Sequence, residues 1–471
     1  DFSASGPGEH LSFILYKENK DTMECLNQLA RVTGTLSTAY TFAGTKDKRG
    51  VTVQKCSGYR VYQSKLEGAY LGPGVKIGGF KYVKDRVNLG DLSGNEFVIT
   101  LRDVALATDH ETETDIPKIL ETSLTSLAES GFINYYGMQR FGTRNISTHQ
   151  VGLAMLASSW ETAVDIIMMP KGDEKPDFVA ARNLWMEKRD YKECLKVFPR
   201  SCIAERAILT AMQKSKRSDD YYGALQAIPR NLRLMYLHAV QSFVWNHAAS
   251  ERIRLYGNKV VKGDLVAKFN PLAQSNASKV TPEDTGDAEA AEITAIEEHR
   301  QGRMIEVELV ETDEQAATKS IEDLVLPLPG HAVKYPTNEI GEFYKSFMAK
   351  YGLDPHDMKR KQRETSLTGD YRRVIIKPKN VSWKSLRYDD PNFPLSMTDL
   401  DRINGAPEPV SIPDGKRLGV IVSFTLETSS YATMALREIL RSDTGAGFQS
   451  VMSNKSKVET DAERTALEDS A

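Results

Sequence analysis

Strand-like and helix-like patterns alternate at both ends of this 471-residue chain, and a mostly helical stretch lies between them. Near the N-terminus, residues 10–16 are apolar and rich in strand formers, and the apolar spacing over residues 21–32 predicts a helix. A half-buried strand is expected at residues 95–102, and a second helix follows at residues 120–129. Two strand–helix units of this kind predict an α+β domain built on a sheet.

The same pattern returns near the C-terminus. Residues 148–244 read as mostly helical, with apolar residues recurring at intervals of three and four. Residues 419–426 then predict a strand, and residues 431–441 predict an amphipathic helix. Because this last pair resembles the first 147 residues more than the middle, we infer that the middle is an insertion. The end of the chain is expected to return and complete the first sheet.

The charge of the chain is unevenly distributed. Residues 271–320 hold twelve acidic and four basic residues, which leaves 57 basic against 52 acidic residues elsewhere. Residues 273–291 are polar and lack aromatic side chains, so they cannot bury enough apolar surface to become ordered, and we expect a disordered loop. The remainder is mildly basic and is therefore compatible with a polyanionic partner.

Several classes of protein are excluded by what the sequence lacks. The four cysteines are far apart and form no C-x-x-C pair, which argues against a disulfide scaffold or zinc site and fits a reducing compartment. No H-E-x-x-H motif and no run of 18 apolar residues occurs, so neither metal chemistry nor a membrane-spanning helix is expected. No secretory signal is visible, and the start at Asp1 suggests that the natural N-terminus lies upstream.

The densest cluster of chemically useful residues is FAGTKDKRGVTVQ, at positions 42–54. Gly44 precedes the turn Lys46-Asp47-Lys48, which by itself is most simply a solvated surface turn. A phosphate-binding loop is a second interpretation, although G-x-x-x-x-G-K-[ST] is absent. In the third interpretation, the flanking lysines favour the charged form of Asp47, and an ionised carboxylate on a loop can act as a nucleophile or base.

The second cluster is GFINYYGMQRFGT, at positions 131–143. Glycines punctuate a loop that carries aromatic, amide and arginine side chains, which are the groups needed to stack on a nucleic-acid base and read its edge. A helix C-terminus followed by an aromatic turn packed in the core explains the same residues. The segment alone does not decide between these interpretations.

Taken together, the segments resemble the signature of the TruD family of pseudouridine synthases, in order and in spacing. The resemblance extends over nearly the whole chain and favours the eukaryotic branch, whose members have a long middle region. One departure is that the family's D-F-x-V-x-E motif upstream of the first helix is replaced by Asp1-Phe2-Ser3-Ala4, which leads almost directly into GEHLSFILY. The matching segments are residues 42–54, 89–102, 131–143, 228–246, 325–330 and 429–440.

The resemblance assigns roles to individual residues. It places the catalytic aspartate of the family at Asp47, which would attack a uridine flipped out of its stack. The sequence leaves open whether the attack falls on the sugar or on the base ring. Asn134 would position Asp47 or the base, and the ring of Tyr136 would stack on or near the base. The remaining residues expected to contact substrate are Lys46, Gln139, Arg140 and Phe141.

The function implied by the resemblance is the isomerisation of uridine to pseudouridine in RNA, without cofactor or metal. The expected substrates are tRNA, small nuclear RNA and some mRNA sites, and the enzyme is expected to be monomeric and mainly nuclear, with a cytoplasmic pool also compatible. A non-catalytic RNA-binding relative and a nucleotide-phosphate enzyme remain as alternatives.

The basic run at residues 359–363 is either a solvated face or a phosphate contact.

The implied fold is an α+β pseudouridine synthase domain with a mixed antiparallel sheet, joined to an α/β TruD-type insertion domain that forms the other wall of an RNA-binding cleft. The catalytic domain is expected to begin with residues 1–147 and to be completed by residues 416–453. The insertion is expected at residues 148–415, with the acidic loop at about 271–303. Residues 454–471 are expected to form a flexible tail.

Overall fold

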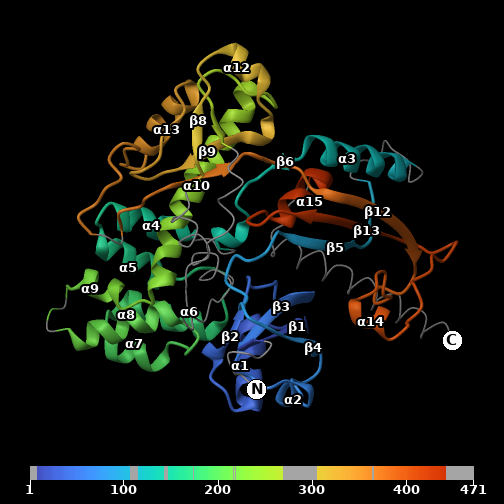
Figure 1. Cartoon of the computed structure of the whole chain (residues 1–471). Coiled ribbons are helices and arrows are strands. Elements are labelled where there is room, and N and C mark those ends of the chain that lie inside the picture. The colour runs from blue at the N-terminus through green and yellow to red at the C-terminus, as the bar shows by residue number, and fades with distance from the viewer. Residues whose placement is uncertain are drawn as a thin grey trace, which may run out of the picture.

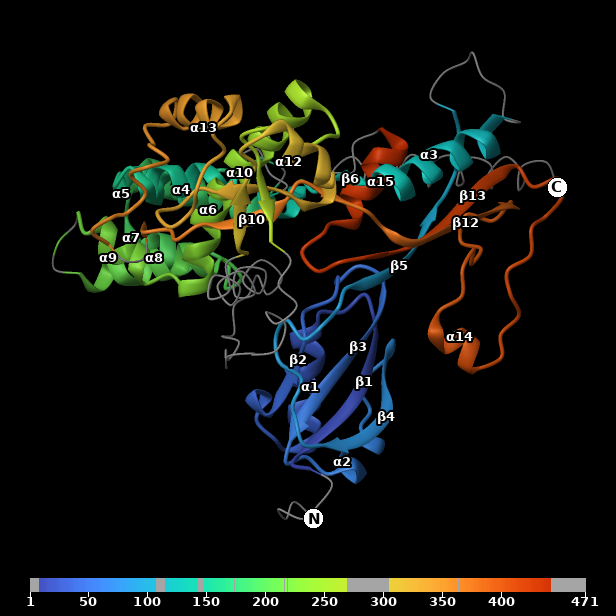
Figure 2. The same ribbon diagram turned by 45° about the horizontal axis from the view of Figure 1, so that its top comes forward.

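In the described residues, two antiparallel sheets stand beside a larger, mainly helical part that carries a third sheet (Figure 1). The structure is a computed structural model that describes residues 8–106, 115–142, 147–172, 174–215, 217, 219–268, 305–362 and 365–441. The expected acidic loop and the C-terminal tail lie outside these residues. Figure 2 shows the first sheet apart from the rest of the chain and joined to the second sheet through β5.

The first sheet has the strand order β2-β3-β1-β4, and all of its strand pairs are antiparallel. One face of this sheet is covered by α1, whose Leu26 and Leu29 pack with Phe13 and Leu15 of β1 in a buried core. The helix begins after Asp21, whose carboxylate accepts hydrogen bonds from two backbone N–H groups. The bounds of these elements are β1 His10–Glu18, α1 Thr22–Thr33, η1 Ser37–Ala39, β2 Tyr40–Phe42, β3 Val51–Tyr59, α2 Gln63–Glu67 and β4 Val75–Val83.

The second sheet joins distant parts of the chain in the order β12-β13-β5. The return strand β13 pairs antiparallel with β5 in the register Leu426 to Asn95, and with β12 on its other edge. Leu120 and Leu124 of α3 pack with Val422 of β13 in a shared core to which α15 contributes Met434. The bounds are β5 Asn95–Leu101, α3 Ile116–Ser130, β12 Lys379–Tyr388, α14 Asp399–Ile403, β13 Arg417–Leu426 and α15 Ala432–Leu440.

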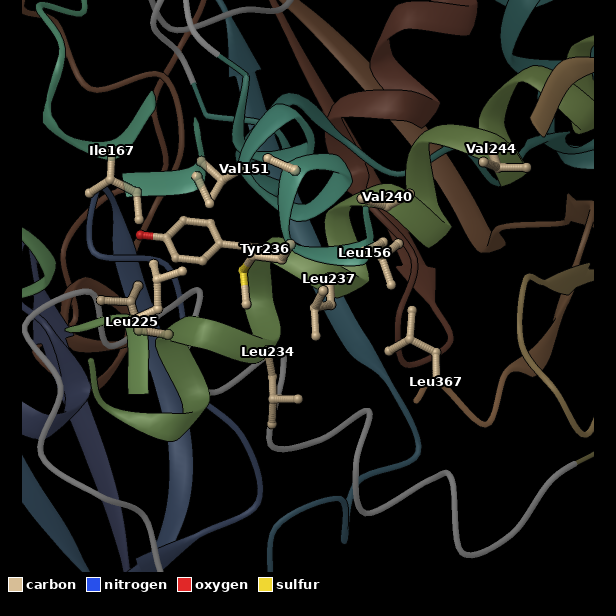
Figure 3. Close-up of a cluster of buried hydrophobic side chains, with 14 of the residues drawn as sticks. Val151, Leu156, Ile167, Leu225, Leu234, Tyr236, Leu237, Val240, Val244 and Leu367 are labelled. Atoms are coloured by element: carbon tan, nitrogen blue, oxygen red, sulfur yellow. The ribbon is translucent and has the colours of Figure 1, made fainter. Parts of the chain in front are cut away.

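In the described residues of the middle of the chain, helices α4 to α10 pack around one large core, to which α13 (Glu339–Ala349) also contributes. The longest is α10, which contributes Leu237, Val244 and the fully buried Trp245. Figure 3 shows part of this core, in which the ring of Tyr236 lies among aliphatic side chains such as Val151. The bounds are α4 Thr148–Leu156, α5 Trp160–Met168, α6 Pro176–Lys188, α7 Tyr191–Val197, α8 Ile203–Lys214, α9 Tyr221–Gln226 and α10 Arg230–Tyr256.

A third sheet, of order β10-β9-β7-β8, packs through β9 against α10, where the indole N–H of Trp245 donates to the Leu326 carbonyl at 3.2 Å. All of its strand pairs are antiparallel, so the middle part combines helices with an antiparallel sheet and is not the α/β unit that the sequence predicts. The short strand β6 pairs with β11 and connects this part to the second sheet. Within the described residues, no helix is both long and apolar enough to cross a membrane. The bounds are β6 Phe132–Ile133, η3 Met138–Arg140, β7 Leu265–Ala267, β8 Val307–Leu309, α12 Asp313–Thr318, η5 Ile321–Asp323, β9 Leu324–Leu328, α13 Glu339–Ala349, β10 Asp370–Arg373 and β11 Ile375–Ile376.

The return strand β13 pairs with β5 from the N-terminal part of the chain, but the two belong to a second sheet and do not complete the first one, and the return begins earlier than expected. From the sequence, residues 148–415 are expected to form the insertion, whereas β12 within that range pairs with β13. The physical reason is that β12 buries its side chains only near its end, at Leu386 and Tyr388, so it lacks a strong strand pattern. The wider division into domains remains a prediction.

Candidate active site

The loop between β2 and β3 carries Lys46 and Asp47. Asp47 is exposed and Lys46 is half-buried. Asn19 holds the far end of this loop, because its side-chain oxygen accepts a hydrogen bond from the N–H of Gly50 at 3.0 Å and its own N–H donates to the Gly50 carbonyl. The loop therefore presents Asp47 to solvent from an anchored backbone.

Three buried polar side chains hold the backbone of residues 44–47. The ammonium of Lys17, in β1, donates to the carbonyl oxygens of Lys46 at 3.1 Å and Asp47 at 2.8 Å. The amide of Gln54, in β3, donates to the Gly44 carbonyl at 3.0 Å and accepts from the hydroxyl of Thr22 at 2.9 Å. We call Lys17, Thr22 and Gln54 the loop seat.

Burying the polar side chains of the loop seat costs free energy unless each polar group forms hydrogen bonds. Lys17 and Thr22 are 0% exposed, and Gln54 is 7% exposed. A buried ammonium or amide that loses its partner costs free energy, so the carbonyls of the loop and the seat hold one another in place. These residues were not expected from the sequence, and the available signal was Lys17, which directly follows the apolar run of β1 at a position where a core residue would be expected.

The second predicted segment lies between α3 and α4. Asn134 is buried, and its side chain donates to the carbonyl of Arg373 at 3.2 Å. The guanidinium of Arg372, in β10, donates to the Asn134 carbonyl at 2.9 Å and to its side-chain oxygen at 2.7 Å. Arg372 was not expected from the sequence, and its contacts fix the orientation of the Asn134 amide.

Tyr136 is also buried, with 5% of its surface exposed. The central carbon of the Arg372 guanidinium lies 4.0 Å from the centroid of the tyrosine ring, and the edge of Trp245 lies against it at a centroid distance of 5.9 Å. Tyr431, from the return segment, packs at 6.3 Å. Tyr136 therefore contributes to the core, and a base would reach its ring only if one of these neighbours moved.

The other predicted contacts have different surroundings. Arg140 is buried and donates to the hydroxyl of Ser242 at 3.2 Å, whereas Gln139 is exposed. Phe141 is half-buried, and its ring meets His149 edge to face at a centroid distance of 6.0 Å. Among the predicted contacts in this segment, Gln139 is thus the one whose side chain is exposed.

The two predicted segments are linked indirectly, through the paired ends of β5 and β13. The ammonium of Lys46 donates to the side-chain oxygen of Asn95, the first residue of β5. Asn95 pairs in register with Leu426, and the next residue, Glu427, forms an ion pair with Arg373 at 3.7 Å. Since the Arg373 carbonyl accepts from Asn134, a short series of contacts connects the Asp47 loop to the second segment.

The described part of the basic run, residues 359–362, lies in the loop after α13. Lys359 and Lys361 are exposed, which suits both a solvated face and a phosphate contact. Arg360 donates to the carbonyl of Asp357, in its own loop. Neither interpretation of this run is favoured by these contacts.

Comparison with known proteins identifies the family. Residues 1–439 match the family model described as tRNA pseudouridine synthase D (TruD), and the chain therefore belongs to the TruD family. It is 41% identical over 451 residues to the multisubstrate pseudouridine synthase 7 of Schizosaccharomyces pombe, covering 94% of this chain and 64% of that protein. It is 38% identical to the human pseudouridylate synthase 7 homolog, covering 93% of this chain and 60% of that protein.

A solved structure supports the fold. The crystal structure of the putative tRNA pseudouridine synthase D from Methanosarcina mazei matches with a TM-score of 0.63 and 25% identity, covering 93% of this chain and 89% of that one. The α+β pseudouridine synthase fold expected from the sequence is thereby confirmed. The chain spans 60–64% of the length of the fungal and human relatives. In the part of the chain that the structure describes, no group of three or more histidine, cysteine, aspartate or glutamate residues is placed to hold a metal ion.

We expect Tyr136→Ala to lower the free energy of unfolding by about 3–5 kcal/mol, because it removes a buried ring from a packed core. Tyr136→Phe keeps the ring and is expected to melt close to the wild type. Thermal melting measures this effect, and the single-turnover rate on RNA at saturating enzyme measures any effect on the reaction. If the alanine variant instead melted normally and reacted about 5- to 150-fold more slowly, the ring would act by stacking on a base.

Proposed function

We propose that this chain isomerises uridine to pseudouridine within RNA, with the carboxylate of Asp47 as the nucleophile. In this reaction the bond between N1 of uracil and C1′ of the ribose breaks, and a bond between C5 and C1′ forms. The proton on C5 is released and N1 gains a proton, so no co-reactant is consumed. Attack on the sugar and attack on the base ring both require an ionised carboxylate that is held in place.

The observation that carries this proposal is the loop seat. Lys17, Thr22 and Gln54 bond to the backbone of residues 44–47, while the Asp47 side chain remains exposed. A covalent nucleophile reacts fastest when its position is fixed before the substrate binds. The reaction barrier then contains no further entropy cost for orienting the nucleophile. A solvated surface turn would not need three buried polar side chains beneath it.

RNA is the proposed substrate because of the family, and the mildly basic balance of the chain outside residues 271–320 is compatible with it. The S. pombe relative is named a multisubstrate pseudouridine synthase, and the family model is named for tRNA. We therefore propose tRNA as the first substrate, with sites in small nuclear RNA and mRNA as further substrates. A mainly nuclear location and a monomeric state belong to the same proposal.

The function is tested by product analysis. The purified protein is incubated with a pool of unmodified tRNA transcripts, and the RNA is digested to nucleosides and separated. We expect a nucleoside with the mass of uridine and the retention of pseudouridine to accumulate over several turnovers. A protein that binds these RNAs tightly but forms no pseudouridine from tRNA, small nuclear RNA or mRNA transcripts would instead be a non-catalytic RNA-binding relative.

A further inference from the structure

A cavity of about 540 Å³ lies beside the Asp47 loop in the first sheet. Its walls come from the loop itself, from β3 and from the connection between β4 and β5. Lys46 lines the cavity and is the immediate neighbour of Asp47, and consecutive Cα atoms are only 3.8 Å apart. The cavity therefore adjoins the proposed reaction site.

The cavity is lined by both aliphatic and basic side chains. Val53, Val83, Val87 and Leu92 supply apolar surface, and pockets of roughly 300–1,000 Å³ with such walls typically bind small organic groups. The basic lining residues are Lys46, Lys55, Lys84 and Arg86.

The acidic residues do not cancel this positive charge. Only two of the fourteen lining residues are acidic, Asp85 and Asp91. The carboxylate of Asp91 accepts hydrogen bonds from the N–H of Asn88 at 2.8 Å and from its side-chain amide at 3.1 Å, so it is engaged in shaping its own loop. Arg86 donates to the side-chain oxygen of Asn88, which orients the guanidinium in the same loop.

We propose that this cavity binds a nucleotide of the RNA that flanks the target uridine, with its base against the aliphatic walls and its phosphate at Lys55, Lys84 and Arg86. The proposal rests on the function proposed above. Phosphate charge matches the excess of basic side chains, and an apolar wall suits the face of any base. A nucleotide held next to Lys46 belongs to the same strand as a uridine held at Asp47.

The cavity is expected to recognise the backbone more than the identity of the base. The amide of Gln54, which could otherwise read a base edge, is engaged by Thr22 and the Gly44 carbonyl. Phosphate contacts position a strand without carrying sequence information. The affinity lost on disabling the cavity should therefore be similar for RNAs that differ at the flanking nucleotide.

Two variants separate charge from shape, and both are measured by fluorescence anisotropy with a labelled tRNA transcript. Lys55→Ala/Lys84→Ala should raise Kd about 5- to 30-fold and reduce the salt slope by about 0.7 per lost phosphate contact. The matched control is Lys76→Ala/Lys118→Ala, which removes two exposed lysines that do not line the cavity. Val53→Trp fills the cavity from an exposed strand position and should raise Kd while leaving the salt slope near that of the wild type.

The proposal is overturned if both cavity variants, melting like the wild type, bind RNA as tightly as the control. It is also overturned if uridine monophosphate binds the wild type tightly and RNA does not compete, since the cavity would then serve free nucleotides. Because anisotropy measures binding and requires no turnover, it tests the cavity independently of the proposed catalytic function. That failure would appear as a wild type that binds RNA and forms no pseudouridine.

Discussion

Asp47→Asn is expected to reduce the rate of pseudouridine formation by at least about 10⁴-fold, because an amide keeps the shape of the side chain but is not a nucleophile. The Kd for RNA should change little, since the backbone of the loop and its basic neighbours are unchanged. The rate is measured as release of tritium from the C5 position of labelled uridine, in a single turnover at saturating enzyme.

The matched control is Asp414→Asn, which removes an exposed carboxylate from a loop in the second half of the chain. This variant should react at the rate of the wild type. If Asp47→Asn retained more than about a tenth of the wild-type rate, Asp47 would not be the nucleophile. The surface-turn interpretation of residues 46–48 would then be favoured.

Lys17→Met is expected to have the second-largest effect, with a loss of roughly 10²-fold in kcat, because a displacement of about 1 Å in a reacting group has a cost of this size. The substitution keeps the length of the side chain but leaves the carbonyls of Lys46 and Asp47 without the ammonium donor. The Kd for RNA should rise much less than kcat falls. The free energy of unfolding should fall by about 1–3 kcal/mol from the loss of the buried hydrogen bonds.

Thr33→Val distinguishes a positioning role for Lys17 from a general loss of stability. The Thr33 hydroxyl is buried next to the same sheet and donates to the Leu29 carbonyl, but it does not contact the loop. This control should lose stability and keep its kcat. Equal losses of kcat in both variants, or a folded Lys17→Met protein with normal kcat, would contradict the positioning role.

Elements with strong local patterns could be predicted from the sequence. The apolar runs and caps of β1, α1, β5, α3 and α15 are contained within their own segments, so the expected strands and helices are confirmed. The mostly helical stretch expected at residues 148–244 is likewise confirmed, and its last helix, α10, continues beyond that range to Tyr256. The short strands of the third sheet were missed, because segments of three to five residues carry too little periodicity.

Only those site residues that lie close together in the sequence could be predicted from it. Lys46, Asp47 and residues 134–141 were found because each group is contiguous in the sequence. Lys17 and Arg372 act on partners 30 and 238 residues away, and no spacing rule connects positions so distant. Tyr136 shows a further limit: an aromatic residue in a glycine-rich loop has the same sequence pattern whether its ring binds a base or packs against Trp245 and Arg372.

The most direct test of the account is a structure of the Asp47→Asn variant bound to a substrate RNA. We expect one uridine to be flipped out of its stack, with its C1′ or base ring within about 3.5 Å of the side chain at position 47, as a near-attack arrangement requires. Gln139 should lie on the same side of the bound nucleotide as the ends of β5 and β13. A complex in which no nucleotide approaches position 47, with the RNA bound on another face, would contradict the assignment of Asp47 as the nucleophile.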